Sequence, residues 1–200
     1  MKLSNISPVL KHFNIPNIIT TLGLVFGIFA AFYLTQGDLR MAIIALFFAG
    51  VMDLIDGYVA VKLNQVSQFG KHLDTLVDFF TCVIMPIWMV FDLLDNNPFV
   101  IVALVFYCIC GLWRLANYNL VGGGKHFTGL PVPAAMSVVT ITIWFVVVYG
   151  ITVWLAAGVF VLMGMLMLST LPLAKYGKWQ VVGGLGGLGF LIYVIFFGGM

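Results

Sequence analysis

The sequence predicts an all-α integral membrane protein, a polytopic bundle of six to eight transmembrane helices with seven as the best count. Of the 200 residues, 62% are hydrophobic and only 8% are charged, whereas a soluble domain has about 25% charged residues. The apolar residues also fall into long uncharged runs, and runs of about 18 residues or more are typical of membrane spans. The connections are short, so we expect residues 1–200 to form a single transmembrane domain.

Seven such runs follow one another along the chain, at roughly 17–35, 38–61, 71–93, 98–118, 131–149, 152–171 and 180–198. We expect residues 1–16 to lie along the cytoplasmic interface as a short amphipathic piece or to form a disordered lead. This segment has no small-residue cleavage pattern, so we expect no cleaved signal peptide. Cys82, Cys108 and Cys110 fall inside the runs, where we expect small core residues and no disulfide.

Positive charge is distributed unevenly about these runs. With the N-terminus inside, the inner side receives eight of the nine lysines and arginines, and the outer side receives only Arg40. Cytoplasmic loops are enriched in lysine and arginine, so we expect a multi-pass protein of the cell membrane with a cytoplasmic N-terminus. Its surroundings are then membrane lipid, and we expect no nucleic-acid partner.

Negative charge is concentrated in the second and third runs. All seven acidic residues are aspartates, and four of them lie between residues 51 and 78. Asp53 and Asp56 are three apart near the cytoplasmic end of the second run. Asp74 and Asp78 are four apart near the start of the third, so each pair shares one helix face. The polar link between the runs can turn the chain, which predicts four carboxylates around one point at the cytoplasmic edge of the membrane.

Four bare carboxylates would repel one another, and ionisable groups within spans are costly and usually functional. Divalent cations resolve this conflict, because Mg²⁺ and Mn²⁺ prefer oxygen ligands. Two aspartates from each of two helices suit two divalent cations, Mg²⁺ or Mn²⁺, of the kind that clamp a phosphoryl group during displacement. Gly57, Ala60 and Gly70 leave space beside the aspartates for a flat or bulky group; helix packing through small residues is the alternative interpretation.

The spacing of these residues resembles the signature of the CDP-alcohol phosphotransferases, D-x2-D-G-x2-A-R-x8-G-x3-D-x3-D. Every spacing matches, and Val61 stands in place of the arginine. The resemblance implies a membrane-helix core, usually in a homodimer, that moves a phosphatidyl group from a CDP-linked lipid to an alcohol and releases CMP. It implies that Asp53, Asp56 and Asp74 are metal ligands. Asp78 would be both a metal ligand and the catalytic base.

The same resemblance implies a nucleotide pocket lined by Gly57, Ala60 and Gly70. Asn17 and Thr20 are further candidates for binding the nucleotide or its diphosphate; they lie one turn apart at the start of the first run, where they point into the site or cap the helix. Lys62 follows the missing arginine but is rotated by about 100° around the helix. It could reach over to the diphosphate, as a point charge without the planar fork of arginine.

A second stretch, WRLANYNLVGGGKHFTGLPVPAA at residues 113–135, resembles the phosphatidylserine synthase branch of that family, which has R-L-A-R-F-N followed by F-x-G-L-P-x-P-A-A. The match makes Arg114 and Asn119 candidates for binding the acceptor or a phosphate, and Lys125, in the loop between the matched segments, is a further candidate. A guanidinium pairs in two-pronged fashion with a phosphate or a carboxylate. The alternatives are an Arg114 that only reaches to the lipid headgroups and a solvated Lys125.

The resemblance therefore implies an enzyme of phospholipid synthesis that transfers a phosphatidyl group from CDP-diacylglycerol to a small alcohol, with L-serine favoured and with a homodimer expected. Val61 and Asn117 replace two arginines of the branch and remove positive charge from near the expected phosphates. Glycerol phosphate, inositol phosphate or choline is then an alternative acceptor. An alternative of a different class is a non-catalytic cation-binding protein or transporter, in which the aspartates bind ions in transit.

Overall fold

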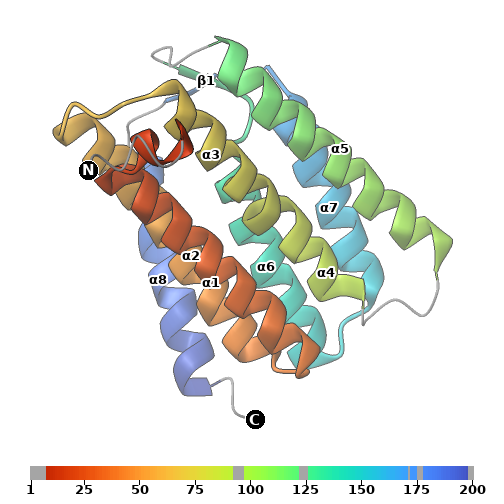
Figure 1. Cartoon of the computed structure of the whole chain (residues 1–200). Helices are drawn as coiled ribbons and strands as arrows, with labels where there is room; N and C mark the ends of the chain where they lie inside the picture. The colour runs from red at the N-terminus through yellow and green to blue at the C-terminus, as the bar shows by residue number, and fades with distance from the viewer. Residues whose placement is uncertain (1–7, 92–96, 122–125, 171, 175–177, 198–200) are drawn as a thin grey trace.

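The computed structural model describes residues 8–91, 97–121, 126–170, 172–174 and 178–197, and these are almost entirely helical (Figure 1). The α-helices are α1 (Ile15–Thr35), α2 (Leu39–Lys62), α3 (Gln68–Asp78), α4 (Met85–Phe91), α5 (Pro98–Val121), α6 (Val132–Tyr149), α7 (Val153–Leu168) and α8 (Lys178–Phe197). A π-helical stretch, η3 (Phe79–Ile84), joins α3 to α4 into one rod. The described residues thus form seven helical rods, and the expected all-α class is confirmed.

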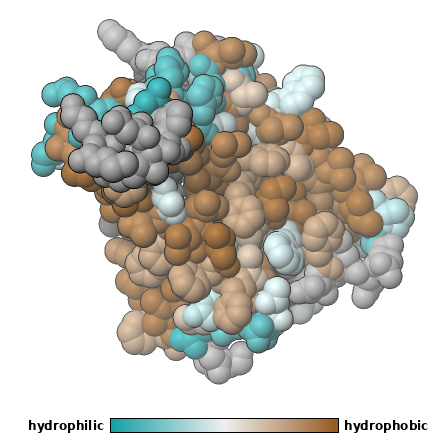
Figure 2. All heavy atoms as spheres, viewed as in Figure 1, coloured by the Kyte–Doolittle hydropathy of each residue, from teal (hydrophilic) through white to brown (hydrophobic). Residues whose placement is uncertain are grey.

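Five of the described rods are long and apolar enough to cross a membrane: Ile15–Thr35, Leu39–Lys62, Gln68–Phe91, Pro98–Leu120 and Val132–Tyr149. Helix α7, with 16 residues, and the segment Gly187–Phe196 of α8 are apolar but shorter. The chain is therefore a multi-pass membrane protein. Figure 2 shows apolar side chains over the middle of the bundle and hydrophilic ones towards its ends, the distribution that surrounding lipid requires.

Polar residues determine where the first three rods begin. Asn14, Asp38 and Ser67 precede α1, α2 and α3, and the side chain of each accepts a hydrogen bond from a backbone N–H three residues further on. Such N-caps satisfy donors that the first turn of a helix leaves unpaired. The cap at Ser67 starts the third rod at Gln68, three residues before the start expected from hydropathy.

The third rod, Gln68–Phe91, lies at the centre of the bundle. Half of its most apolar window (50%) is buried, a larger share than in any of the other four long rods. Large side chains from several helices fill the interior and are less than 2% exposed, among them Leu46, Tyr107, Ile143 and Phe160. A polar group carried into this interior by the third rod must therefore find its partners within the protein.

The two ends of the bundle differ. Figure 1 shows the N-terminal segment, the start of α3 and β1 at one end, and the C-terminus at the other. At that second end, the guanidinium of Arg40 in the first turn of α2 donates a hydrogen bond to the carbonyl of Ile195 in the last turn of α8. An arginine there satisfies a carbonyl that the ending helix leaves free and complements the helix dipole. Arg40 thus fixes α8 against α2.

The N-terminal segment packs on the start of α3. Residues Pro8–His12 form a 3-10 helix, η2, and the His12 ring stacks on Phe69 with centroids 4.3 Å apart and planes within 4°. The amide of Asn17 donates to the His12 carbonyl at 2.7 Å. From residue 8 onwards this segment is therefore a folded part of the bundle and no disordered lead, while residues 1–7 lie outside the described range.

A two-stranded ribbon was not predicted from the sequence. Strand β1 (His126–Thr128) pairs antiparallel with β2 (Pro172–Ala174). Next to it, the N–H of Leu130 donates to the Leu166 carbonyl at 2.9 Å. Gly129 makes this contact possible, because it has a φ of 79° and because a β-carbon on it would lie 2.5 Å from the Met167 carbonyl oxygen. The turn before α6 is thus held against the end of α7.

Gly129→Ala should destabilise the protein more than Gly150→Ala. Both glycines have a positive φ, but a β-carbon at Gly150 would meet nothing within 4 Å. Gly150→Ala should then cost about 1 kcal/mol, the strain of one left-handed residue. Gly129→Ala adds the overlap with backbone, for about 3 kcal/mol or more in total. Thermal unfolding in detergent measures both; equal losses would mean that β1 and its turn are not held against α7.

Candidate metal centre and active site

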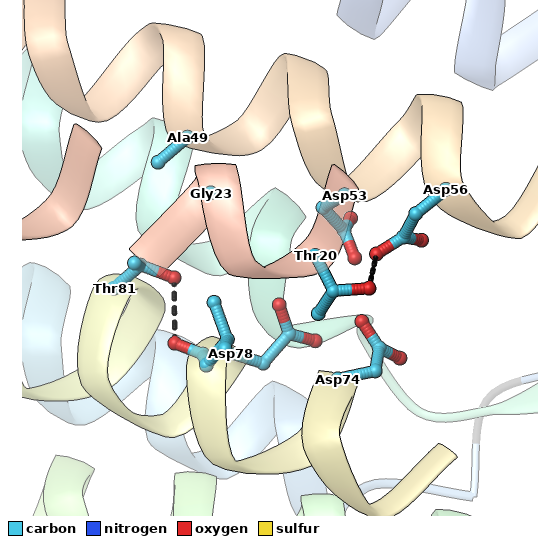
Figure 3. Close-up of a pocket in the computed structure, with 9 residues that line it drawn as sticks. Thr20, Gly23, Ala49, Asp53, Asp56, Asp74, Asp78 and Thr81 are labelled. Carbon is cyan, nitrogen blue, oxygen red and sulfur yellow. Dashed lines mark hydrogen bonds between the residues drawn. The ribbon is translucent and has the colours of Figure 1, made fainter. Parts of the chain in front are cut away.

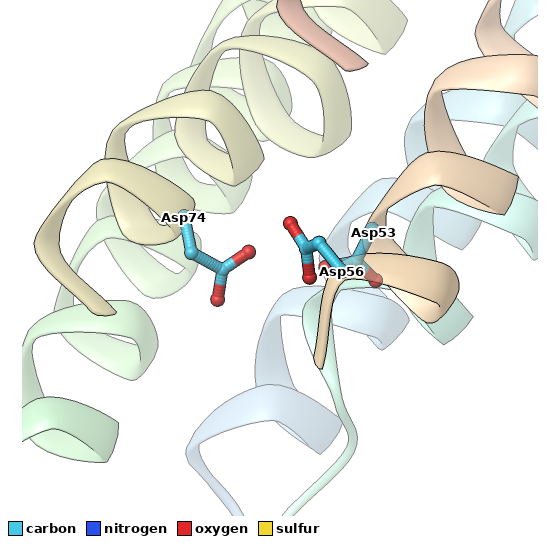
Figure 4. Close-up of side chains that lie close together, drawn as sticks. All are labelled: Asp53, Asp56 and Asp74. Carbon is cyan, nitrogen blue, oxygen red and sulfur yellow. The ribbon is translucent and has the colours of Figure 1, made fainter. Parts of the chain in front are cut away.

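Helices α2 and α3 bring three aspartates together. The side chains of Asp53 and Asp56 on α2 face that of Asp74 on α3 across the gap between the two helices (Figure 4). One carboxylate oxygen from each lies within 4.8 Å of the other two. The predicted convergence of the two helix faces is therefore present for these three residues.

Asp78 lies one turn further along α3, and its side chain also points into the pocket (Figure 3). It is 8% exposed, and the Sγ of Cys82 lies 3.8 Å from its Oδ1, within the range of a thiol hydrogen bond. Its carboxylate is not part of the group of three whose oxygens lie within 4.8 Å of one another. Asp78 therefore has a different environment from Asp53, Asp56 and Asp74, whose carboxylate oxygens lie close to one another.

The four aspartates line one small, partly open cavity of about 10 Å³. Its other lining residues are Thr20, Gly23, Ala49, Val77 and Thr81. The polar groups in this lining are carboxylates and hydroxyls, and within the described part of the chain no lysine or arginine pairs with the carboxylates. A set of oxygen donors with uncompensated negative charge fits a hard divalent cation such as Mg²⁺ or Mn²⁺.

Thr20 lies in the site, and the cap of α1 is a different residue. The hydroxyl of Thr20 hydrogen-bonds the carboxylate of Asp56, and it also lies 3.1 Å from the Pro16 carbonyl (Figure 3). The N-cap of α1 is Asn14, whose side chain accepts from the N–H of Asn17 at 2.9 Å. Thr20 therefore orients Asp56 from a third helix.

The small residues near the aspartates divide into two kinds. A β-carbon on Gly57 would meet nothing within 4 Å, so the space beside Asp56 is open, and Ala60 one turn on is half-buried. A β-carbon on Gly70 would instead lie 2.8 Å from the Oδ1 of Asn17. Gly70 therefore allows α1 to approach α3, which is the packing interpretation, whereas Gly57 leaves room for a ligand.

Arg114 and Asn119 do not line the cavity. Arg114 is buried, its Nε donates to the Leu130 carbonyl at 3.4 Å, and its guanidinium lies 6.0 Å from the Tyr118 ring centroid. The amide of Asn119 donates to the hydroxyl of Thr75 at 2.8 Å, beside Asp74. These contacts join α5 to the β1–α6 connection and to α3, respectively.

Of the two candidate lysines, the structure describes only Lys62, which does not line the cavity. The Nζ of Lys62 lies 5.7 Å from the centroid of the Tyr58 ring, and both side chains are exposed. Lys125 falls outside the described residues. Val61 and Asn117, which stand where arginines were expected, are both exposed.

Sequence reasoning missed four of the lining residues and the role of Cys82. Gly23 follows Thr20 by three residues, and Thr81 follows Asp78 by three, so helical spacing from the predicted residues could have found both. Ala49 and Val77 carry no polar group and give no such signal. Cys82, which was expected to be a small core residue, is buried, but its thiol also contacts Asp78.

Thr20→Val should weaken the binding of Mn²⁺ by about tenfold, because a residue that orients a metal ligand typically contributes 10–100-fold to metal affinity. The matched control is Thr21→Val. The Thr21 hydroxyl is exposed and bonds only its own helix, at the Asn17 carbonyl 2.7 Å away. Mn²⁺ titration followed by electron paramagnetic resonance measures the affinity of both variants; an unchanged affinity in Thr20→Val would remove Thr20 from the site.

Comparison with known proteins places this geometry in a family. The sequence model of the CDP-alcohol phosphatidyltransferases matches residues 13–168, which include every element that lines the cavity. The chain is also similar to curated proteins. One, from Methanocaldococcus jannaschii, is named CDP-diacylglycerol–serine O-phosphatidyltransferase and is 31% identical over 166 residues, which are 83% of this chain and 76% of that protein.

Two further relatives have related names. A CDP-diacylglycerol–serine O-phosphatidyltransferase from Bacillus subtilis is 32% identical over 124 residues, 60% of this chain and 70% of its own. An archaetidylserine synthase from Methanothermobacter thermautotrophicus is 29% identical over 137 residues, 66% of this chain and 59% of its own. The aspartate cluster, the membrane helices and the family match lead to one conclusion: the chain belongs to the CDP-alcohol phosphatidyltransferase family and is a transferase.

Proposed function

We propose that this protein transfers a phosphatidyl group from CDP-diacylglycerol to L-serine, giving phosphatidylserine and CMP. The observation that carries the proposal is the set of three carboxylates from two helices within 4.8 Å, with a fourth one turn further along α3, in a membrane protein of this family. The names of the similar proteins from M. jannaschii and B. subtilis support serine as the acceptor.

Asp53, Asp56 and Asp74 would hold two divalent cations, Mg²⁺ or Mn²⁺, with Asp78 as a further ligand. When bound, the cations supply neutralisation of the diphosphate charge. The protein's part is to present the carboxylates in fixed positions. Thr20 holds Asp56 from α1, and the Thr75–Asn119 hydrogen bond ties the helix beside Asp74 to α5. Fixed ligands need no rearrangement as charge develops in the reaction.

Asp78 is the proposed base. It lies outside the close group of three but lines the same cavity. A base must reach the hydroxyl proton while the other three carboxylates hold the cations. The serine oxygen forms a bond to the phosphorus that bears the diacylglycerol, and the bond from that phosphorus to the CMP oxygen breaks. The hydroxyl proton goes to the Asp78 carboxylate, and CMP leaves with the electron pair of the broken bond.

The open space at Gly57 is where we place part of the nucleotide or diphosphate. It adjoins Asp56, and Ala60, one helical turn after Gly57, is also small. Arg114 and Asn119 lie outside the cavity, so their proposed role towards the acceptor is to hold the α5 end of the site in position. The proposed environment is the cell membrane, with this end of the bundle in the cytoplasm, in a homodimer whose protomer is a single domain over residues 1–200.

Purified protein should release CMP from CDP-diacylglycerol in the presence of Mn²⁺ and L-serine. Asp78→Asn should lower the rate by about 100-fold or more, since a positioned general base contributes 10²–10⁴-fold. The matched control is Asp38→Asn, at the opposite end of α2, where an asparagine can still cap the helix. Glycerol phosphate, inositol phosphate and choline complete the panel. CMP release with one of these instead would reassign the acceptor, and no release with any of them would favour a cation-binding protein.

Gly57→Ala should raise the KM for CDP-diacylglycerol by about tenfold, the cost of one misplaced contact of 1.4 kcal/mol. Its stability should be unchanged or slightly higher, because the added methyl meets nothing and alanine favours a helix. Gly158→Ala on α7 makes the same change into open space away from the site and should leave KM unaltered. An unaltered KM in Gly57→Ala would show that this space is not used by the substrate.

A further inference from the structure

The rod that carries Asp74 and Asp78 changes its helical form directly after Asp78. Helix α3 ends there, and η3 (Phe79–Ile84) is π-helical. The N–H of Met85 donates to the carbonyl of Phe80, five residues back, where an α-helix would use the carbonyl four residues back. A π turn inside an α-helix inserts one extra residue and often occurs at a functional site.

Pro86 explains the change. Proline has no N–H, so the carbonyl of Cys82, four residues earlier, loses the donor that a regular helix would supply, and the proline ring crowds that carbonyl. The hydroxyl of Tyr107 on α5 fills the gap and donates to the Cys82 carbonyl at 3.0 Å. Tyr107 is fully buried, and its ring packs edge-on against Phe160 with centroids 4.9 Å apart. The Tyr107 hydroxyl is thus fixed in place.

The extra residue alters which side chains share a face with the aspartates. With regular α spacing, Trp88 would follow Asp74 and Thr81 on the face towards the cavity, fourteen and seven residues on. The inserted residue rotates everything after it by about 100° relative to the aspartates. Trp88 is accordingly 37% exposed, whereas Met89 is 3% exposed and packs in the core.

Cys82 links the π turn to Asp78 directly. Its carbonyl accepts from Tyr107, and its Sγ lies 3.8 Å from the Oδ1 of Asp78. A rotation of this turn would therefore move both the thiol beside Asp78 and the Thr81 hydroxyl that lines the cavity. The α4 segment, anchored in the core by Met89, cannot turn to compensate.

We propose that Tyr107 is a positioning residue: through its hydrogen bond to the Cys82 carbonyl it maintains the π turn, and the π turn keeps Asp78 facing Asp53 and Asp56. The effect on catalysis rests on the proposed function, whereas the effect on the metal centre does not. Tyr107 does not line the cavity, and its hydroxyl bonds the Cys82 carbonyl, so it acts through Cys82.

Tyr107→Phe removes only the hydroxyl. It should lower kcat for CMP release by about tenfold and weaken Mn²⁺ binding by about tenfold, the lower end of the 10–100-fold range typical of groups that orient metal ligands. The KM for CDP-diacylglycerol should stay within about twofold, because the open space at Gly57 is untouched. Tyr149→Phe is the matched control: it removes a tyrosine hydroxyl hydrogen-bonded at 2.8 Å to Tyr193, between α6 and α8 and away from the cavity.

A second variant separates position from stability. Pro86→Ala combined with Tyr107→Phe returns an N–H that can bond the Cys82 carbonyl, so the midpoint of thermal unfolding should recover to that of the wild type. kcat and Mn²⁺ affinity should remain low, because the turn can now close into a regular α-helix. Recovery of kcat and Mn²⁺ affinity in the double variant would overturn the proposal. So would a Tyr107→Phe variant that matches Tyr149→Phe in kcat and Mn²⁺ affinity.

If the protein does not catalyse the proposed reaction, the measurements on the wild type differ from those that would contradict the role of Tyr107. A wild-type protein that binds Mn²⁺ but releases no CMP contradicts the proposed reaction, and the Mn²⁺ affinities of the three variants still decide the role of Tyr107. A wild-type protein that binds no Mn²⁺ contradicts both proposals.

Discussion

Three carboxylates within 4.8 Å of one another repel, and the apolar bundle around them supplies little water to screen that charge. The rest of the site follows from this constraint. Each partly buried carboxylate needs donors that satisfy it without filling the centre of the cavity. A hydroxyl on α1 serves Asp56, and a thiol on η3 serves Asp78. These are weak, neutral donors, so the negative charge remains available to a cation.

The constraint also accounts for the arrangement of the first three rods. A hairpin of α2 and α3 alone would hold the aspartates only loosely. Helix α1 approaches α3 closely because Gly70 has no side chain to obstruct Asn17, and the His12–Phe69 stack closes the same seam from the N-terminal segment. Gly70, which the sequence resemblance places in the nucleotide pocket, thus allows the close packing of α1 on α3 that fixes the site.

The sequence predicted the rods and the three converging aspartates because both depend on short-range periodicity: long apolar runs, and pairs three or four residues apart. It did not predict the β1–β2 ribbon, since strands of three residues carry no recognisable period. Nor did it predict the partner of Asn119, which lies 44 residues away in the chain. The π turn is an intermediate case: Pro86 marks a missing donor in the sequence, but only the packing of α5 identifies Tyr107 as its replacement.

The contact between Arg40 and Ile195 bears on the order in which the protein is made. The chain leaves the ribosome N-terminus first, so α1, α2 and α3 exist long before α8. Helix α8 nevertheless packs on α2, and Gly187 comes close to Phe47 there. One flank of the second rod is therefore covered only after α8 has been made, when the carbonyl of Ile195 accepts the hydrogen bond from Arg40. The helices that carry the aspartates are thus made well before α8 covers this flank of α2.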